Sequence, residues 1–419
     1  MRKTKTYKTS DSNTFPKWDP LRRISDSPGE VLKKVDERLD YLEKEYFKDK
    51  GDKDGNMGNI LGFHGVSRRD LLKWTVFLTS AMMLPPVFRP RVARAAGVLT
   101  KTPLIWLDMA DCMGNTEAFI RTAHPTPAEI ILNYVSVDYM ESIMAPAGYQ
   151  AESRRVETIK KHKGKYILVV EGAIPTGLGG RFLTIGANGE TGLEITKEAA
   201  RDAGLVIAIG NCASYGGIPA AAPNPTAAVP VSSVTSRQVI NIPSCPANPV
   251  NVVGTLVEYI LVGKAPDLDN LGRPLWAFDG RLHDNCYRRA HFDAGEFVRS
   301  WGDEGAKKQY CLYMMGCKGP FTWNNCTTME YNQDMSFPMR AGHGCIGCSQ
   351  PKFWDRMSPF EKPIADAKIF FPAVESTADK VGLGLFGAMG AGIAAHAIYS
   401  GVKKERDKHK EGEGKDKKE

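Results

Sequence analysis

Cysteine is confined to one part of this 419-residue chain, because none precedes Cys112 and none follows Cys348. All nine cysteines therefore lie in the central region, which is the first sign that they share a task. Basic residues give a net charge of +7, but they concentrate in the two ends, MRKTKTYK and KKERDKHKEGEGKDKKE. The body has no excess of basic charge that would indicate a nucleic-acid partner. With 42% hydrophobic and 25% charged residues, the composition is that of a globular protein with room for two or three domains.

Charge is missing from a second stretch, since no Asp, Glu, Lys or Arg occurs from Val381 to Val402. A helix of about 20 residues crosses a bilayer, so this run is long enough. Its glycines and alanines suit close packing against other membrane helices. Lys403, Lys404 and Arg406 follow directly, and positive charge marks the cytoplasmic side. We predict a transmembrane helix that leaves the body outside the cytoplasm. The alternative is a Gly/Ala helix buried in a soluble core, because the run is only mildly hydrophobic.

The N-terminal segment resembles a twin-arginine export signal. Arg68 and Arg69 are followed by a modest apolar run to Leu84 and then by the small-x-small sequence Ala93-Arg94-Ala95, which is typical of a cleavage site. A short amphipathic helix with two surface arginines is the alternative. Residues 1–65 are polar, exceed what such a signal needs, and are predicted to be disordered.

The region from about 100 to 275 predicts a doubly wound α/β fold. Four apolar, β-rich runs, at 103–109, 165–174, 204–210 and 238–243, are separated by helical patterns such as 127–144 and 190–204. Cys112, Cys212 and Cys245 follow the first, third and fourth runs. Sites in open α/β sheets form beyond the carboxyl ends of the strands, so these cysteines should converge there. Any one of them alone could be a buried core thiol.

The second half carries a further set of metal-binding residue types. It contains His283, Cys286, Cys311, Cys317, Cys326 and the C-x-x-C pair Cys345 and Cys348. A disulfide framework is the alternative for an exported chain, but nine is an odd number. A single tetrahedral zinc site would use only four ligands. Three separate groups of ligands favour iron-sulfur clusters instead.

Between Trp106 and about Trp354 the chain resembles the small subunit of nickel-iron hydrogenases in a series of motifs. These are, in order, WLDMADCMGNTEAF, VEGAIPTG, GNCASYGGIPAA, IPSCPANP, LHDNCYRRAHFDAGEF, CLYMMGCKGPFTWNNC and AGHGCIGCSQPKFWD. The resemblance implies a distal 4Fe-4S cluster on His283, Cys286, Cys311 and Cys317. It implies a medial cluster on Cys326, Cys345 and Cys348. Pro338 stands where a fourth cysteine would otherwise lie, which implies a 3Fe-4S form there.

The proximal cluster departs from the usual family pattern. The family has the motif C-x-x-C after the first strand, and in this chain Asn115 stands in place of the second cysteine of that motif. Cys112, Cys212 and Cys245 remain, and Asp111 offers a carboxylate, as in the variant of the family with three Cys and one Asp. We predict a 4Fe-4S cluster on these four residues. A 3Fe-4S cluster or an Asn115 ligand is the alternative, and Asp111 could simply be a loop acid or a helix cap.

The resemblance also implies a fold, a function and partners. The fold is a flavodoxin-like parallel-sheet domain, a small irregular iron-sulfur domain and the C-terminal transmembrane helix. The predicted boundaries are an extension with export signal (1–96), the flavodoxin-like domain (97–275), the cluster domain (276–365), a linker (366–380), the membrane helix (381–402) and a basic cytoplasmic tail (403–419).

As a hydrogenase small subunit, the protein would have no catalytic residue of its own. It would pass electrons from a nickel-iron centre in the large subunit to a membrane cytochrome b or another quinone-reducing partner, on the periplasmic side of the cytoplasmic membrane. Two alternatives differ in class. One is the iron-sulfur subunit of another respiratory oxidoreductase, and the other is a disulfide-bonded, tail-anchored binding protein.

Overall fold

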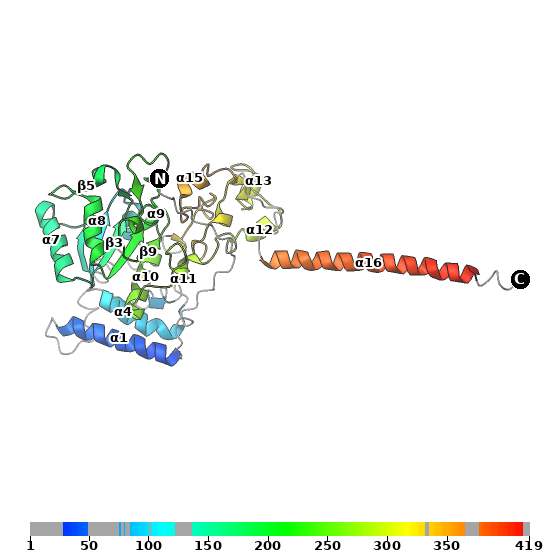
Figure 1. Cartoon of the computed structure of the whole chain (residues 1–419), viewed down its shortest axis with the longest axis horizontal. Helices are drawn as coiled ribbons and strands as arrows, with labels where there is room; N and C mark the ends of the chain where they lie inside the picture. Colours follow the sequence, from blue (N-terminus) through cyan, green and yellow to red (C-terminus); the bar gives the residue numbers. More distant parts are fainter. Residues whose placement is uncertain are drawn as a thin grey trace, which may run out of the picture. The chain divides into compact units, whose positions relative to one another are not determined.

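The computed structural model describes residues 28–48, 75, 76, 79, 84–99, 102–121, 136–331, 335–364 and 377–413 (Figure 1). Arg68 and Arg69 lie outside these ranges. The chain divides into two compact units, one of residues 1–287 with 312–364 and the other of residues 288–311 with 365–419. Each is described by itself.

A five-stranded parallel sheet organises the first unit. Its strands are β1 (Pro103–Asp108), β2 (Ser136–Met140), β3 (Ile167–Glu171), β7 (Leu205–Ile209) and β9 (Val239–Ile242), in the order β2-β1-β3-β7-β9. The α/β class and the four predicted strands are confirmed. This order is the flavodoxin-like arrangement, in which the winding direction reverses between β1 and β3.

The second strand corrects the sequence prediction. Residues 127–144 carry a helical pattern, yet Ser136–Met140 pair with β1 as an edge strand. Tyr139 and Met140 are buried, and Tyr139 donates a hydrogen bond to Glu152 (3.0 Å). Valine and tyrosine favour strands, and pairing with β1 outweighs the local helical periodicity.

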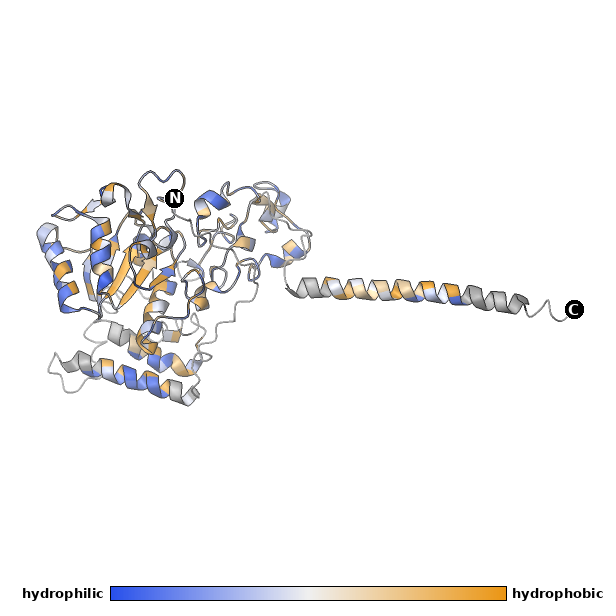
Figure 2. Ribbon diagram, viewed as in Figure 1, coloured by the Kyte–Doolittle hydropathy of each residue, from blue (hydrophilic) through white to orange (hydrophobic). Residues whose placement is uncertain are grey.

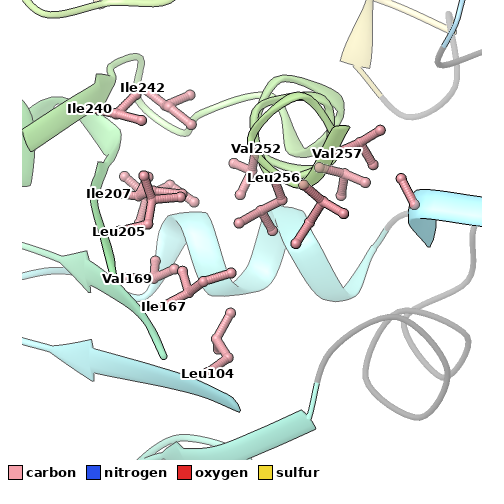
Figure 3. Close-up of a cluster of buried hydrophobic side chains, with 14 of the residues drawn as sticks. Leu104, Ile167, Val169, Leu205, Ile207, Ile240, Ile242, Val252, Leu256 and Val257 are labelled. Carbon is pink, nitrogen blue, oxygen red and sulfur yellow. The ribbon is translucent and has the colours of Figure 1, made fainter. Parts of the chain in front are cut away.

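Apolar side chains cover both faces of the sheet, because successive residues of a strand point to opposite sides. On one face, β-strand residues such as Leu104, Val169 and Ile207 pack against Val252 and Leu256 of helix α10 (Pro249–Val262), as Figure 3 shows. On the other face a second cluster includes residues of α7 (Gly148–Lys161) and α8 (Gly192–Arg201). In Figure 2 the strands between these layers are predominantly hydrophobic.

Two N-terminal helices add a further layer beyond α10. Helix α1 (Pro28–Lys48) and helix α4 (Arg89–Leu99) contribute buried residues to the same cluster as α10. Figure 1 shows α1, α4 and α10 side by side. The prediction of disorder for residues 1–65 is therefore wrong for 28–48. Its leucines and valine recur at helical spacing within a highly charged segment, and tertiary packing stabilises such a helix.

The remaining elements are short. They are α5 (Gly114–Ile120), α9 (Gly210–Tyr215), α11 (Leu275–Phe278), α12 (Arg289–Asp293), α13 (Glu304–Lys307), α15 (Phe353–Met357), the 3-10 turns η1 (Pro86–Phe88), η3 (Gly177–Gly180), η4 (Val231–Ser233), η5 (Tyr313–Met315) and η6 (Gly319–Phe321), and the two-stranded pairs β4 (Ile174–Pro175) with β8 (Ala228–Val229) and β5 (Thr184–Ile185) with β6 (Glu190–Thr191). Cysteine-bearing loops connect several of them.

In the second unit, helix α16 (Thr377–Glu413) contains the predicted membrane segment. Leu383–Lys403 is long and apolar enough to cross a membrane, with a mean hydropathy of 1.3 in its most apolar window, none of which is buried. The helix therefore has the length and composition of a membrane span.

Candidate metal centres

The loops that follow three parallel strands carry the first group of cysteines. Cys112 follows β1, Cys212 lies in α9 directly after β7, and Cys245 follows β9. Burial, and then the charges of Cys112 and Asp111, raise the pKa of Cys212 to about 11. Burial likewise raises the pKa of Cys245 to about 12, with contributions from Cys348, Cys212 and Cys112. The structure thus brings these three thiols together at the carboxyl edge of the sheet.

Asp111 lies beside this group among other carboxylates. One oxygen each of Asp108, Asp111 and Glu171 lie within 4.8 Å of one another. Burial, then Glu171, then Asp108 raise the pKa of Asp111 to about 7. Its Oδ1 accepts a long hydrogen bond from the Met113 N–H (3.3 Å), whereas Oδ2 has no hydrogen-bond partner among the described residues. A carboxylate oxygen next to the thiols is therefore available to a metal.

Asp111 does not cap helix α5. Glu171 at the end of β3 does so instead, because its two carboxylate oxygens accept hydrogen bonds from the N–H groups of Asn115 (2.8 Å) and Thr116 (2.9 Å). The same oxygens accept from the Asn115 amide (3.0 Å) and the Thr116 hydroxyl (2.7 Å). Glu171 is fully buried, and these four donors satisfy it.

Asn115 is a structural link between the loop that carries Cys112 and the loop that carries Cys245. Its Nδ2 donates to Glu171, and its Oδ1 accepts from the N–H of Ala247, two residues after Cys245 (2.8 Å). The side chain is buried, and both ends of its amide are used. This arrangement leaves Asn115 poorly suited to bind iron and disfavours the alternative in which it is the fourth ligand.

A second group comprises Cys326, Cys345 and Cys348. Burial is the main cause that raises the pKa of each thiol, and Cys348 adds to the shifts of Cys326 and Cys345. The sulfur of Cys345 accepts the N–H of Gly347 (3.3 Å). Pro338 is exposed, and its carbonyl accepts the N–H of His343 (3.0 Å). Cys348 thus lies near both of the other thiols, and Pro338 lies in an exposed turn that precedes Cys345 in the chain.

The third group is built around Cys317. Its sulfur accepts the N–H groups of Gly319 (3.4 Å) and Cys345 (3.3 Å), and Cys286 contributes to its raised pKa after burial. His283 is 6% exposed, and its carbonyl accepts the Cys286 N–H (3.4 Å). These three residues belong to the first unit.

Cys311 belongs to the second unit. It is buried, its N–H donates to the Glu296 carbonyl (3.0 Å), and its own carbonyl accepts from the Val298 N–H (3.0 Å). The backbone around this thiol is therefore fixed by hydrogen bonds within its own unit.

Lys318 is an unusual neighbour of these cysteines because its side chain is fully buried. Its ammonium donates to the carbonyls of Gly316 (2.7 Å), Pro359 (3.3 Å), Phe360 (3.4 Å) and Lys362. Burial lowers its pKa, whereas Cys317, Cys345 and Glu361 act in the opposite direction. Its hydrogen-bond acceptors among the described residues are carbonyls, so its nearby counter-charges are Glu361 and, when ionised, Cys317 and Cys345.

The residues in these groups fit iron-sulfur clusters. No disulfide joins any of the nine cysteines, all of which lie in the described part of the chain, so the disulfide framework has no support. Glycines leave room next to the sulfurs: a Cβ on Gly217 would lie 2.6 Å from Cys212 Sγ, and one on Gly114 would lie 3.2 Å from Cys112 Sγ. Buried thiols with raised pKa values become thiolates only when a cation replaces the proton, which is what cluster iron does.

Comparison with known proteins assigns the family. Residues 278–361 match the C-terminal family of the NiFe/NiFeSe hydrogenase small subunit, and residues 112–259 match the family "NADH ubiquinone oxidoreductase, 20 Kd subunit". The quinone-reactive Ni/Fe-hydrogenase small chain of Wolinella succinogenes is 48% identical over 348 residues, which cover 82% of this chain and 98% of that protein. The chain belongs to the small subunits of nickel-iron hydrogenases.

Two further comparisons agree with this hydrogenase small-subunit assignment. The uptake hydrogenase small subunit of Azotobacter vinelandii is 43% identical over 351 residues, which cover 84% of this chain and 97% of that protein. The [NiFeSe]-hydrogenase of Desulfomicrobium baculatum matches with a TM-score of 0.59 and 33% identity, covering 63% of this chain and 99% of that chain. The family pairs such chains with a large subunit that holds the nickel-iron centre. As a hydrogenase small subunit, this protein is part of an oxidoreductase.

The sequence prediction missed two polar residues of this small subunit. Glu171 ends an apolar strand, and a charged residue in such a run is a signal for a buried, paired group. Lys318 lies directly between Cys317 and Gly319, and its position next to a predicted ligand is the feature of the sequence that could have indicated its importance.

Proposed function

We propose that this protein transfers electrons from the large subunit to a quinone-reducing partner in the membrane, a cytochrome b or its equivalent. Bound iron-sulfur clusters would supply the one-electron redox steps that link the two-electron oxidation of hydrogen, which releases two protons, to the reduction of a quinone. The quinone-reactive name of the Wolinella succinogenes relative supports this acceptor class.

Three sets of residues hold the clusters in this proposal. The proximal 4Fe-4S set is Asp111, Cys112, Cys212 and Cys245; the medial 3Fe-4S set is Cys326, Cys345 and Cys348; and the distal 4Fe-4S set is His283, Cys286, Cys311 and Cys317. Cys112, Cys212 and Cys245 follow the parallel strands β1, β7 and β9 at the same edge of the sheet, and this convergence is the single observation that carries the proposal. Asp111 is preferred to Asn115 as the fourth proximal ligand because its Oδ2 is available, whereas the Asn115 amide is occupied.

The location is part of the same proposal. The twin-arginine segment would export the folded, cluster-loaded protein, and α16 would anchor it with its basic end in the cytoplasm. The absence of charge from Val381 to Val402 and the exposure of the most apolar window of α16 support a membrane anchor. The boundaries given in the sequence analysis remain predictions of domain organisation.

Iron and acid-labile sulfide measurements on the purified two-subunit complex test this proposal. We expect about twelve irons per complex: about eleven from two four-iron clusters and one three-iron cluster of the small subunit, and one from the nickel-iron centre of the large subunit. EPR of the oxidised complex should show the signal of a 3Fe-4S centre. Zinc in place of iron, or iron near zero in a folded complex, would refute the proposed electron relay.

A further inference from the structure

The N-terminal helices cover a face of the sheet domain that would otherwise be apolar. On α1, Val35 and Leu39 are 5% and 0% exposed, and they lie four residues apart on one side of the helix. Phe88, Val92 and Ala95, from η1 and α4, are 6%, 0% and 0% exposed. All five join the cluster that includes α10 and the sheet. The side chains of α1 therefore pack as those of an integral layer do.

An arginine of α1 completes the end of α10. The Nε of Arg38 donates a hydrogen bond to the carbonyl of Ile260 in the last turn of α10 (2.9 Å). A Cβ on Gly263, which ends α10 with φ +77°, would lie 2.6 Å from the Arg38 guanidinium carbon. Carbonyls at a helix C-terminus lack intrahelical donors, so a cation there stabilises the helix. Arg38 therefore joins α1 to the C-terminus of α10.

Ion pairs fix α1 to α4 as well. Arg91 contacts Asp36 at 2.5 Å, and Arg94 contacts Asp40 at 2.5 Å and Asp36 at 3.6 Å. These groups are partly exposed, so each pair adds little stability by itself. They fix the register of the two helices, because Asp36 and Asp40, one turn apart on α1, pair with Arg91 and Arg94 of α4.

This layer includes the predicted cleavage site. Ala93-Arg94-Ala95 lies inside the helix α4, where Ala95 is fully buried and Arg94 is ion-paired. Cleavage of a folded protein requires local opening, because a peptidase binds an accessible, unfolded segment. In this arrangement the cleavage site is not accessible to a peptidase.

We propose that α1 is a built-in clasp, an intramolecular partner of the α4–α10 face that keeps the cleavage site closed until the clasp is released. The interaction surface is the apolar face of α4 and α10, and its occupant is residues 28–48 of the same chain. The protective role rests on the proposed export and processing, whereas the docking itself does not.

Hydrogen exchange measured by mass spectrometry on the full-length precursor tests the docking. The variant Leu39→Asp places a charge in a fully buried position and should lower the protection of α4 amides by at least about tenfold. Tyr41→Asp is the matched control, because it introduces the same residue on the same helix at a position that is 61% exposed. A precursor with Arg68→Lys and Arg69→Lys, which should stay in the cytoplasm, supplies uniform material. Equal protection of α4 in both variants would overturn the docking.

Pulse-chase labelling in cells then tests protection of the site. Leu39→Asp should speed conversion of the precursor several-fold, and Tyr41→Asp should not. Asp36→Arg should speed conversion less than Leu39→Asp does, and adding Arg91→Asp should partly restore the normal rate. This pair of variants tests the same contact if the Leu39→Asp protein fails to retain its iron. If α4 amides exchange faster but the precursor is processed at the same rate or more slowly, α1 does not protect the cleavage site and the proposal is overturned. Normal processing with both twin arginines replaced would instead refute the export route and leave the exchange result standing.

Discussion

Lys318 should raise the reduction potentials of the clusters that its neighbours hold. Its side chain is fully buried, its ammonium donates to carbonyl oxygens in the described part of the chain, and it interacts electrostatically with Cys317, Cys345 and Glu361. A reduced cluster carries one more negative charge, so a nearby cation stabilises the reduced form. Replacing Lys318 with a neutral residue should therefore lower the potentials of both the distal and the medial cluster.

The size of this shift follows from Coulomb's law. For a separation of the order of 8 Å and an effective dielectric constant of about 20, a unit charge contributes roughly 2 kcal/mol. For a one-electron couple that free energy corresponds to roughly 90 mV, and solvent screening reduces the expected shift to about 30–90 mV.

Two substitutions separate charge from hydrogen bonding. Lys318→Gln keeps an amide N–H group that can donate to the carbonyls of Gly316 and Lys362, whereas Lys318→Met keeps only the volume. If the charge is the cause, both variants should shift the potentials by similar amounts in an EPR-monitored redox titration. Lys307→Gln is the control, because it removes the same charge from a side chain that is 67% exposed and should leave the potentials unchanged.

The result that would refute this reasoning is a Lys318→Met complex with full iron content and unchanged medial and distal potentials. A shift in Lys318→Met but not in Lys318→Gln would assign the effect to the carbonyl hydrogen bonds rather than to the charge. Iron content measured on the same samples separates both results from a failure of cluster assembly.

The remaining predictions address the proximal and medial sites, the scaffold and the anchor. Asp111→Asn should alter the EPR spectrum and the reduction potential of the proximal cluster, and an unchanged spectrum and potential would make Asp111 a loop acid. Pro338→Cys should convert the medial centre to 4Fe-4S and remove the oxidised 3Fe-4S EPR signal, whose persistence would place the medial site elsewhere. Glu171→Gln should cost roughly 2–4 kcal/mol in chemical unfolding, because one amide cannot accept all four donors; Glu157→Gln, with an acid that is 73% exposed, is the control. Ending the chain after Asp379 should release a complex that reduces an artificial dye but not membrane quinone, and continued membrane attachment would contradict the anchor.

Much of the sheet could be predicted from the sequence because its strands are buried on both sides. Such strands are nearly continuous apolar runs, and the cysteine, glycine and proline residues that follow them mark their ends. Ser136–Met140 was missed because this edge strand is short, only its last two residues are buried, and a helical pattern overlaps it. Its identity depends on pairing with β1, a contact that the local sequence does not encode.

The N-terminal helix was missed for a related reason. Residues 28–48 are highly charged, and only a narrow line of apolar side chains, which includes Val35 and Leu39, distinguishes them from a disordered segment. That line is too weak to stabilise a helix alone. It becomes decisive only when α4 and α10 provide the surface on which it packs, and the α10 part of that surface comes from residues more than 200 positions away.

Asn115 shows that residue types alone do not decide which residues bind the cluster. The sequence establishes that a thiolate is absent at this position, but it leaves the amide as one more ligand candidate. The structure shows that the amide joins Glu171 to Ala247 and so ties the end of β3 to the loop that carries Cys245. A cysteine could bind iron here but could not make both hydrogen bonds. Asn115 therefore links the two loops, and we propose as the fourth ligand the neighbouring Asp111, whose buried Oδ2 has no hydrogen-bond partner among the described residues.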